Sequence, residues 1–153
     1  MATTDDGVLR APHVLEYEYK RSVGPVIGAF MTALKEGRIV GVVSQGSVVV
    51  PPTEYDPHSG DPTGEIVEVG PAGVVTTWSW AQDPLKDQPL GRPFAWALVQ
   101  LDGATTSMLH AVDAGGRDKM SSGMRVTARF RPPDERQGNV RDIECFVPEE
   151  PTR

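Results

Sequence analysis

The chain has 153 residues, enough to bury one hydrophobic core as a single domain or a domain with an appendage. A formal net charge of −6 argues against general nucleic-acid binding, which depends on Lys and Arg neutralising phosphates. The lone Cys145 excludes an internal disulfide and fits a reducing compartment. The first residues are polar and acidic, unlike a signal peptide, and no apolar run approaches the roughly 20 residues that span a bilayer. These features predict a cytoplasmic protein.

The N-terminal part is expected to contain a tail and one helix. Residues 1–10 are expected to form a loose tail, or an arm that becomes ordered only against a partner. A helix is predicted over residues 25–36, because Pro25 suits a first turn and Gly37 a C-terminal stop. Such a short helix must pack its apolar stripe against something. Two alternatives stay open: the stripe packs on the rest of the chain, or part of it, with Phe30 as the candidate residue, faces a partner subunit.

Residues 42–59 keep the spacing of a zinc ribbon but not its ligands. Cysteines at four positions would give C-x2-C-x10-C-x2-C, in which two tight turns present thiolates to one tetrahedral zinc ion. The residues at these positions are Val42, Gln45, Asp56 and Ser59. Because such a site requires thiolate or imidazole, we expect no structural zinc, and Asp56 with His58 would hold at most an adventitious ion. Residues 39–43 and 47–50 are expected to form the short strands of this degenerate ribbon.

From residue 65 onward, apolar and polar residues alternate with the period of two that is typical of strands. Residues 94–101 are apolar on both faces and predict a central buried strand, followed by an antiparallel return over 105–112. A long connection over 113–123 precedes the fourth strand. Five strands with this connection predict an open Greek-key barrel, the OB-fold. On the first strand Val74, Thr76, Trp78 and Trp80 are predicted to share one face, and on the fourth strand Met124, Val126, Ala128 and Phe130 alternate with polar residues. On the last strand Ile143, Cys145 and Val147 are predicted to face inward.

The sequence contains no strong catalytic pattern. His110 has the apolar neighbours Met108 and Val112 at i±2, so we interpret it as a core or rim residue. Cys145 alternates with apolar residues and is interpreted as a small buried side chain without an activating base. Catalytic residues are therefore expected to be absent from this chain.

Two surface features stand out. Residues 117–141 contain seven cations against three acids, and Arg125, Arg129 and Arg131 fall on one outward face. Such a stripe can hold the phosphates of a coenzyme A ester, since Arg matches phosphate oxygens in a bidentate manner; it can also be an ordinary solvated strand face. The second feature is the aromatic pair Trp78 and Trp80, of which one is expected at a rim or a partner interface.

Taken together, the helix, the degenerate ribbon and the barrel resemble the family called domain of unknown function 35. The matching residues include the Pro51-Pro52 pair inside the ribbon. They also include the segments 30–41, 73–78, 93–103 and 123–126, in the family's order and spacing. The chain departs from the family in lacking the four cysteines. The resemblance implies the division 1–38 N-terminal tail and helix, 39–64 ribbon-like segment without metal, 65–148 OB-fold barrel and 149–153 tail.

The resemblance also implies a function. Family members are similar to accessory subunits of thiolase-fold enzymes that handle acyl-CoA, including aldolases that cleave CoA-linked side chains in steroid catabolism. The catalytic residues then belong to the thiolase-like partner, and this chain needs no cofactor of its own, with a coenzyme A ester as a possible shared substrate. Two rivals are a stand-alone acyl-CoA-binding module and a nucleic-acid-binding OB-fold protein, the latter disfavoured by the net charge.

Overall fold

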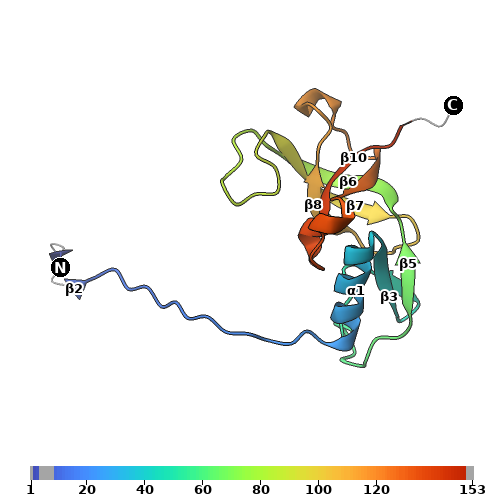
Figure 1. Cartoon of the computed structure of the whole chain (residues 1–153), viewed down its shortest axis with the longest axis horizontal. Helices are drawn as coiled ribbons and strands as arrows, with labels where there is room; N and C mark the ends of the chain where they lie inside the picture. The colour runs from blue at the N-terminus through green and yellow to red at the C-terminus, as the bar shows by residue number, and fades with distance from the viewer. Residues whose placement is uncertain (1, 4–8, 151–153) are drawn as a thin grey trace.

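The computed structural model describes residues 2–3 and 9–150. A β-barrel forms one half of the body, and a small sheet with a helix forms the other (Figure 1). Of residues 1–10, on which the prediction of a tail rests, the description covers only the short antiparallel pair β1 (Ala2–Thr3) and β2 (Leu9–Arg10). No helix in the described part of the chain has the length and apolar character needed to cross a membrane.

The α1 helix (Pro25–Glu36) has the bounds predicted from the sequence. Gly37 ends it in the left-handed conformation, with φ 79°, and its N–H bonds to carbonyls of the last turn. At the other end, the Glu54 carboxylate accepts hydrogen bonds from the N–H groups of Val26 and Ile27, each at 3.0 Å. A distant loop therefore supplies the cap that Gly24 cannot provide.

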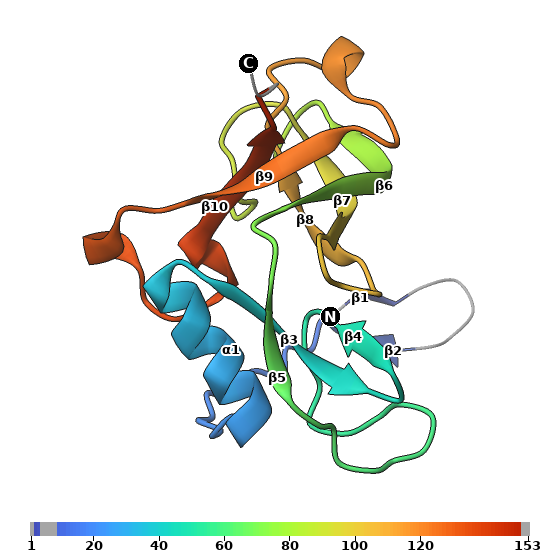
Figure 2. The same cartoon turned by 90° about the vertical axis from the view of Figure 1, so that its right-hand side faces the viewer.

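A three-stranded antiparallel sheet lies beside the helix, in the order β4-β3-β5. Its strands are β3 (Ile39–Ser44), β4 (Ser47–Val49) and β5 (Ile66–Val69). The first two correspond to the predicted ribbon strands. The β5 strand, which the sequence reading grouped with the barrel, instead pairs with β3 and leads from the small sheet up into the barrel (Figure 2).

The barrel is closed, where the sequence predicted an open one, because β10 pairs with both β8 and β9, and it has the strand order β10-β8-β7-β6-β9. Its strands are β6 (Ala72–Ala81), β7 (Phe94–Leu101), β8 (Met108–Val112), β9 (Arg125–Phe130) and β10 (Ile143–Pro148). All pairs are antiparallel except β8 with β10. Short 3-10 helices interrupt the connections: η1 (Arg117–Lys119) before β9, then η2 (Pro133–Glu135) and η3 (Val140–Asp142) before β10. The predicted mainly β OB-fold with one preceding helix is confirmed.

Two irregularities in the strands correct the predicted grouping of side chains on strand faces. The register of β6 shifts between Val75 and Thr77, so Val75 is fully buried before the shift, and Trp78 and Trp80 pack against the core after it. The prediction had joined Val74 to the tryptophans. In β10 a second shift separates Ile143 from Cys145. A bulge inserts one residue and moves every later side chain to the other face.

In β10 the shift sends the buried side chains to two places. Ile143 and Phe146 belong to the main core, whereas Cys145 packs in a second cluster with Leu90, Phe94 and Ala111. Val147, which the prediction placed in the core, packs only partly buried against that second cluster.

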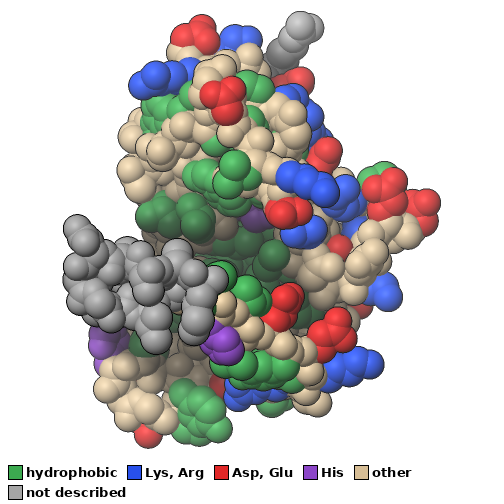
Figure 3. All heavy atoms as spheres, turned by 90° about the vertical axis from the view of Figure 1, so that its left-hand side faces the viewer, with side chains coloured by type: hydrophobic (Ala, Val, Ile, Leu, Met, Phe, Trp, Pro, Cys, Tyr) green, Lys and Arg blue, Asp and Glu red, His purple; other side chains and the backbone are tan. Residues whose placement is uncertain are grey.

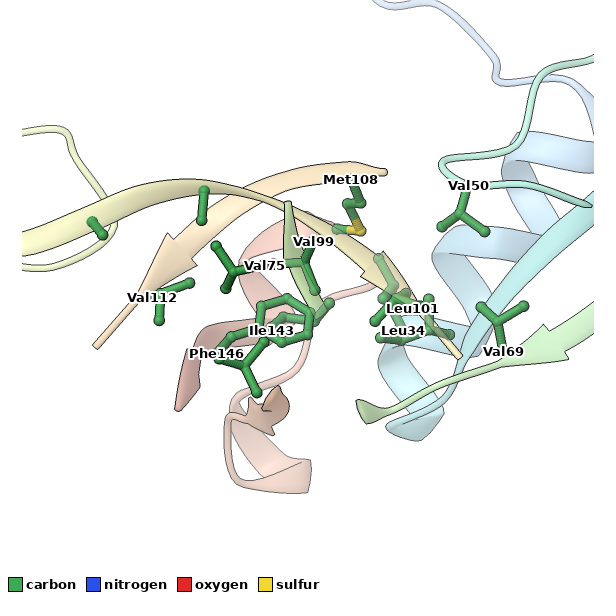
Figure 4. Close-up of a cluster of buried hydrophobic side chains, with 14 of the residues drawn as sticks. Leu34, Val50, Val69, Val75, Val99, Leu101, Met108, Val112, Ile143 and Phe146 are labelled. Carbon is green, nitrogen blue, oxygen red and sulfur yellow. The ribbon is translucent and has the colours of Figure 1, made fainter. Parts of the chain in front are cut away.

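The main core is continuous from the barrel to the helix. Figure 4 shows Leu34 of α1 beside Leu101 and Val69, next to the barrel residues Val75, Val99 and Phe146. Phe30, Ala33 and Leu34 are all buried. The apolar stripe of the helix therefore packs on its own chain, which decides between the two alternatives for these residues.

Candidate functional site

The best candidate for a binding site is a groove of about 450 Å³ on the outside of the barrel. Its floor comes from β7, β8 and the start of β10, and its walls from the loop 82–93 and the segment 131–142. These two connections follow the first and fourth barrel strands and are the loops with which OB-folds bind ligands. The lining residues are Pro51, Asp87, Gln88, Pro89, Trp96, Met108, Leu109, His110, Arg131, Val140, Arg141, Ile143 and Glu144.

Apolar side chains dominate this groove. Leu109 of β8 is 59% exposed and Val140 of η3 is 44% exposed, although both are large hydrophobic residues. Trp96 lies half-buried beside them and packs edge-on against Phe94, with ring centroids 5.2 Å apart. Figure 3 looks onto this side of the molecule and shows hydrophobic side chains gathered in a recess across its middle. An exposed apolar patch next to a hollow is typical of an interaction site.

His110 fixes one wall of the groove and is not a free acid or base. Its Nδ1 accepts a hydrogen bond from the Ala111 N–H at 2.9 Å, so the proton lies on Nε2, which donates to the Val140 carbonyl at 3.2 Å. Burial lowers the pKa of His110. The neutral imidazole therefore ties η3 to β8, as expected for a rim residue.

The wall formed by residues 131–142 is preorganised. Asp142 is buried, and its carboxylate accepts hydrogen bonds from the N–H groups of Gln137, Gly138 and Asn139. Arg131 donates from Nε to the Arg141 carbonyl at 2.7 Å. Both arginines line the groove, so cations stand on this wall, whereas the exposed Asp87 stands on the opposite one.

The predicted arginine stripe is largely neutralised by its own chain. Arg125 makes two hydrogen bonds of 2.7 Å to the Asp102 carboxylate and a third of 2.7 Å to Glu149, which raises its pKa. Arg129 pairs with Glu144 at 2.8 Å. Of the three stripe residues, only Arg131 lines the groove.

The degenerate ribbon holds a polar contact where a metal would lie. Val42 is fully buried in β3, Gln45 is exposed in the β3–β4 turn, and neither side chain makes a hydrogen bond to Asp56. Instead the Ser44 hydroxyl donates to the Asp56 carboxylate at 2.6 Å. Among residues 2–3 and 9–150, no three His, Cys, Asp or Glu side chains are arranged to hold a metal ion.

Asp56 also organises its own turn. The carboxylate accepts the N–H groups of His58 at 2.9 Å and of Ser59 at 2.8 Å. The Ser44 bond and then these two bonds lower the pKa of Asp56 to about 2. Sequence reasoning missed Ser44, although its place next to the Gln45-Gly46 turn could have indicated it. The Ser44–Asp56 contact joins the two turns that zinc joins in a ribbon.

The remaining candidates lie elsewhere. Phe30 is buried in the core, and Trp78 and Trp80 are half-buried against it, with the Trp80 indole N–H donating to Gln82 at 3.0 Å. Cys145 is buried, which raises the pKa of its thiol to about 11 and leaves little nucleophilic thiolate.

The comparisons with known proteins agree with this architecture. Residues 66–131 match the family model described as ChsH2, C-terminal OB-fold domain. The structure is similar to a chain of the "Ltp2-ChsH2(DUF35) aldolase", with a TM-score of 0.60 and 21% identity, covering 84% of this chain and 98% of that one.

It is also similar to a protein of unknown function from the DUF35 family of Sulfolobus solfataricus, with a TM-score of 0.55 and 22% identity, covering 69% of this chain and 77% of that one. A search of curated proteins found no match. The resemblance to the domain of unknown function 35 family is confirmed.

Proposed function

We propose that this chain is a non-catalytic accessory subunit of an aldolase whose catalytic subunit has a thiolase-like fold. Two matches carry the proposal: the ChsH2 family model over residues 66–131, which include four of the five barrel strands, and the structural likeness to nearly the whole length of a chain of the Ltp2-ChsH2 aldolase.

The chemistry of the described residues supports this assignment. The two side chains best suited to catalysis are committed to structure, since His110 is held as a neutral imidazole and the Cys145 thiol is buried with a raised pKa. We assign the bond-breaking step to the partner, and to this chain the stabilisation of the partner and of an acyl-CoA site near the interface. The substrate class that the resemblance favours is a CoA ester with a cleavable side chain, as in steroid or lipid catabolism.

Co-purification of the tagged full chain from its native cell extract tests the proposal. We expect a thiolase-like protein in near-stoichiometric amount, identified by mass spectrometry. Co-expression of the two should raise the melting temperature of both, because binding to the native state stabilises it. The complex should cleave an acyl-CoA aldol, and this chain alone should not. A chain that elutes alone, with no change in stability beside its candidate partner, would contradict the proposal.

A further inference from the structure

An extended arm leads into α1 and leaves large apolar side chains in solvent. Residues 11–24 form no helix, strand or turn, and run away from the body toward the left of Figure 1. Leu15, Tyr17 and Tyr19 are 80%, 71% and 75% exposed. Solvating two tyrosines and a leucine on one short segment is unfavourable, so such a segment is expected to bury them against a partner.

The arm has the side-chain pattern of a strand that covers an apolar surface. In an extended chain successive side chains point to opposite sides, so Leu15, Tyr17 and Tyr19 share one side while Glu16 and Glu18 share the other. The Tyr17 and Tyr19 rings lie with centroids 6.0 Å apart, as side chains on one side must. The segment therefore presents an apolar side of Leu15 and the two tyrosines, and an opposite side on which the exposed Val14 precedes the two glutamates; Lys20 and Arg21 follow.

The groove offers the complementary surface. Its floor carries Leu109 and Trp96 for the apolar side of an arm, and Val140 adds a third apolar side chain from the wall. Arg131 and Arg141 stand on one wall and Asp87 on the other, while the Glu144 carboxylate at the floor is paired with Arg129. This charge order matches the arm, whose two glutamates precede two cations, and it sets a direction: the glutamates toward residues 131–142 and Lys20 toward Asp87.

The path of the arm points to the groove of another molecule. Gly24 has the extended conformation φ −70° and ψ 173°, and no turn occurs in residues 11–24 to return the chain to its own barrel. At about 3.3 Å per residue, the eight steps from Val23 back to Leu15 reach roughly 26 Å beyond the body. The four tyrosines of a reciprocal pair bury about 600–1,000 Å², and the two Leu15 side chains bring this area closer to the roughly 1,200 Å² at which specific interfaces begin.

We propose that the arm of one copy binds in the groove of a second copy, and that the two copies exchange arms around a two-fold axis. The apolar side of Leu15, Tyr17 and Tyr19 covers Leu109, Val140 and Trp96 of the other copy. This inference concerns contacts between copies of this chain and does not depend on the aldolase subunit.

Light scattering on the purified full chain tests the exchange. We expect twice the mass of one 16.5 kDa chain, and a dimer dissociation constant that rises by at least about tenfold in the Tyr17→Asp/Tyr19→Asp variant and in Leu109→Asp. Ile66→Asp is the matched control, since Ile66 is also an exposed aliphatic strand residue but lies outside the groove. It should leave the mass unchanged.

Cross-linking then identifies the contact. A Tyr17→Cys chain and a differently tagged Leu109→Cys chain, mixed and treated with a short bismaleimide, should give a product with both tags; replacing Leu109→Cys by Ile66→Cys should abolish it. A monomer at all concentrations would overturn the proposal. So would a link formed only within single chains that carry Tyr17→Cys and Leu109→Cys together. The readout needs no other subunit, so it stays distinct from the co-purification result.

Discussion

The barrel and the small sheet are held together by different interactions. The barrel closes on itself around buried apolar side chains such as Val75, Val99 and Phe146. The β4-β3-β5 sheet shares part of this core, but the carboxylates of Glu54 and Asp56 hold its outer loop, residues 51–62, through several hydrogen bonds each. In a zinc ribbon a metal ion joins the two turns. A short loop can therefore keep its shape without the metal when hydrogen-bonded carboxylates replace the cross-link, whereas the barrel depends on packed volume.

Removing packed volume from the barrel should have the largest effect. Phe146 is fully buried, lies at the centre of the core and packs edge-on against His110 at 5.6 Å. Phe146→Ala should lower the free energy of unfolding by about 3–5 kcal/mol, from lost burial and from the cavity that remains. Urea unfolding followed by circular dichroism measures this loss.

The control for this variant is Leu85→Ala, because Leu85 is a large apolar residue that is 72% exposed. Its free energy of unfolding should stay within about 0.5 kcal/mol of the wild type. A loss below about 1 kcal/mol in Phe146→Ala would show that the barrel does not depend on this packing.

The charge of Asp56 should make the small sheet sensitive to acid. The pKa of Asp56 is lowered from its ordinary 3.8 to about 2 in the folded chain. As pH falls, Asp56 is therefore protonated in the unfolded chain before it is protonated in the folded chain. The contribution of its carboxylate to the free energy of unfolding is complete above pH 3.8 and is lost as pH falls through about 2. We expect the wild type to exceed Asp56→Asn in melting temperature by a few degrees near neutral pH, and this difference to shrink below pH 4.

Ser44→Ala sharpens this test. The Ser44 hydroxyl contributes the largest share of the lowered pKa of Asp56, so its removal should shift the acid transition toward higher pH and reduce the difference from Asp56→Asn. Equal differences between wild type and Asp56→Asn at neutral pH and at acid pH would mean that the carboxylate charge does not hold the two turns together.

Loss of the helix cap should have a smaller effect. Glu54→Ala leaves the N–H groups of Val26 and Ile27 without the carboxylate, for which a loss of about 1 kcal/mol is typical of helix caps. Amide hydrogen exchange should accelerate at these two residues and not in the barrel strands. Glu54→Gln is the matched control, since its side-chain oxygen can still accept. Unchanged exchange in Glu54→Ala would exclude the cap as a tie between loop and helix.

The sequence predicted what depends on local pattern. Pro25 and Gly37 define the helix, and the period of two locates the barrel strands, because capping and side-chain alternation are local properties. The shift between Val75 and Thr77 carries no compositional mark, so Val74 and Thr76 were wrongly grouped on one face with Trp78 and Trp80. Ser44 was missed because a fixed spacing was imposed on a hairpin whose turn is two residues long. The groove was not predictable in detail, since its walls, residues 82–93 and 131–142, are far apart in sequence.

The smallest effect on stability is expected at the barrel surface, where polar contacts are numerous but exposed to solvent. Arg125 bonds to Asp102 and Glu149, and all three side chains are substantially exposed. Exposed ion pairs stabilise little and are screened by salt, so Arg125→Ala should leave the melting temperature almost unchanged, and any small fall should vanish at high ionic strength. Arg125→Lys provides the control that keeps the charge. Scanning calorimetry at low and high salt separates the outcomes. If Arg125→Ala lowers the melting temperature as much as Asp56→Asn does, then the number of polar contacts determines how much they stabilise the protein. If the melting temperature stays unchanged, the burial of the contacts determines it, and this is the outcome expected from the contrast between the loop 51–62 and the barrel surface.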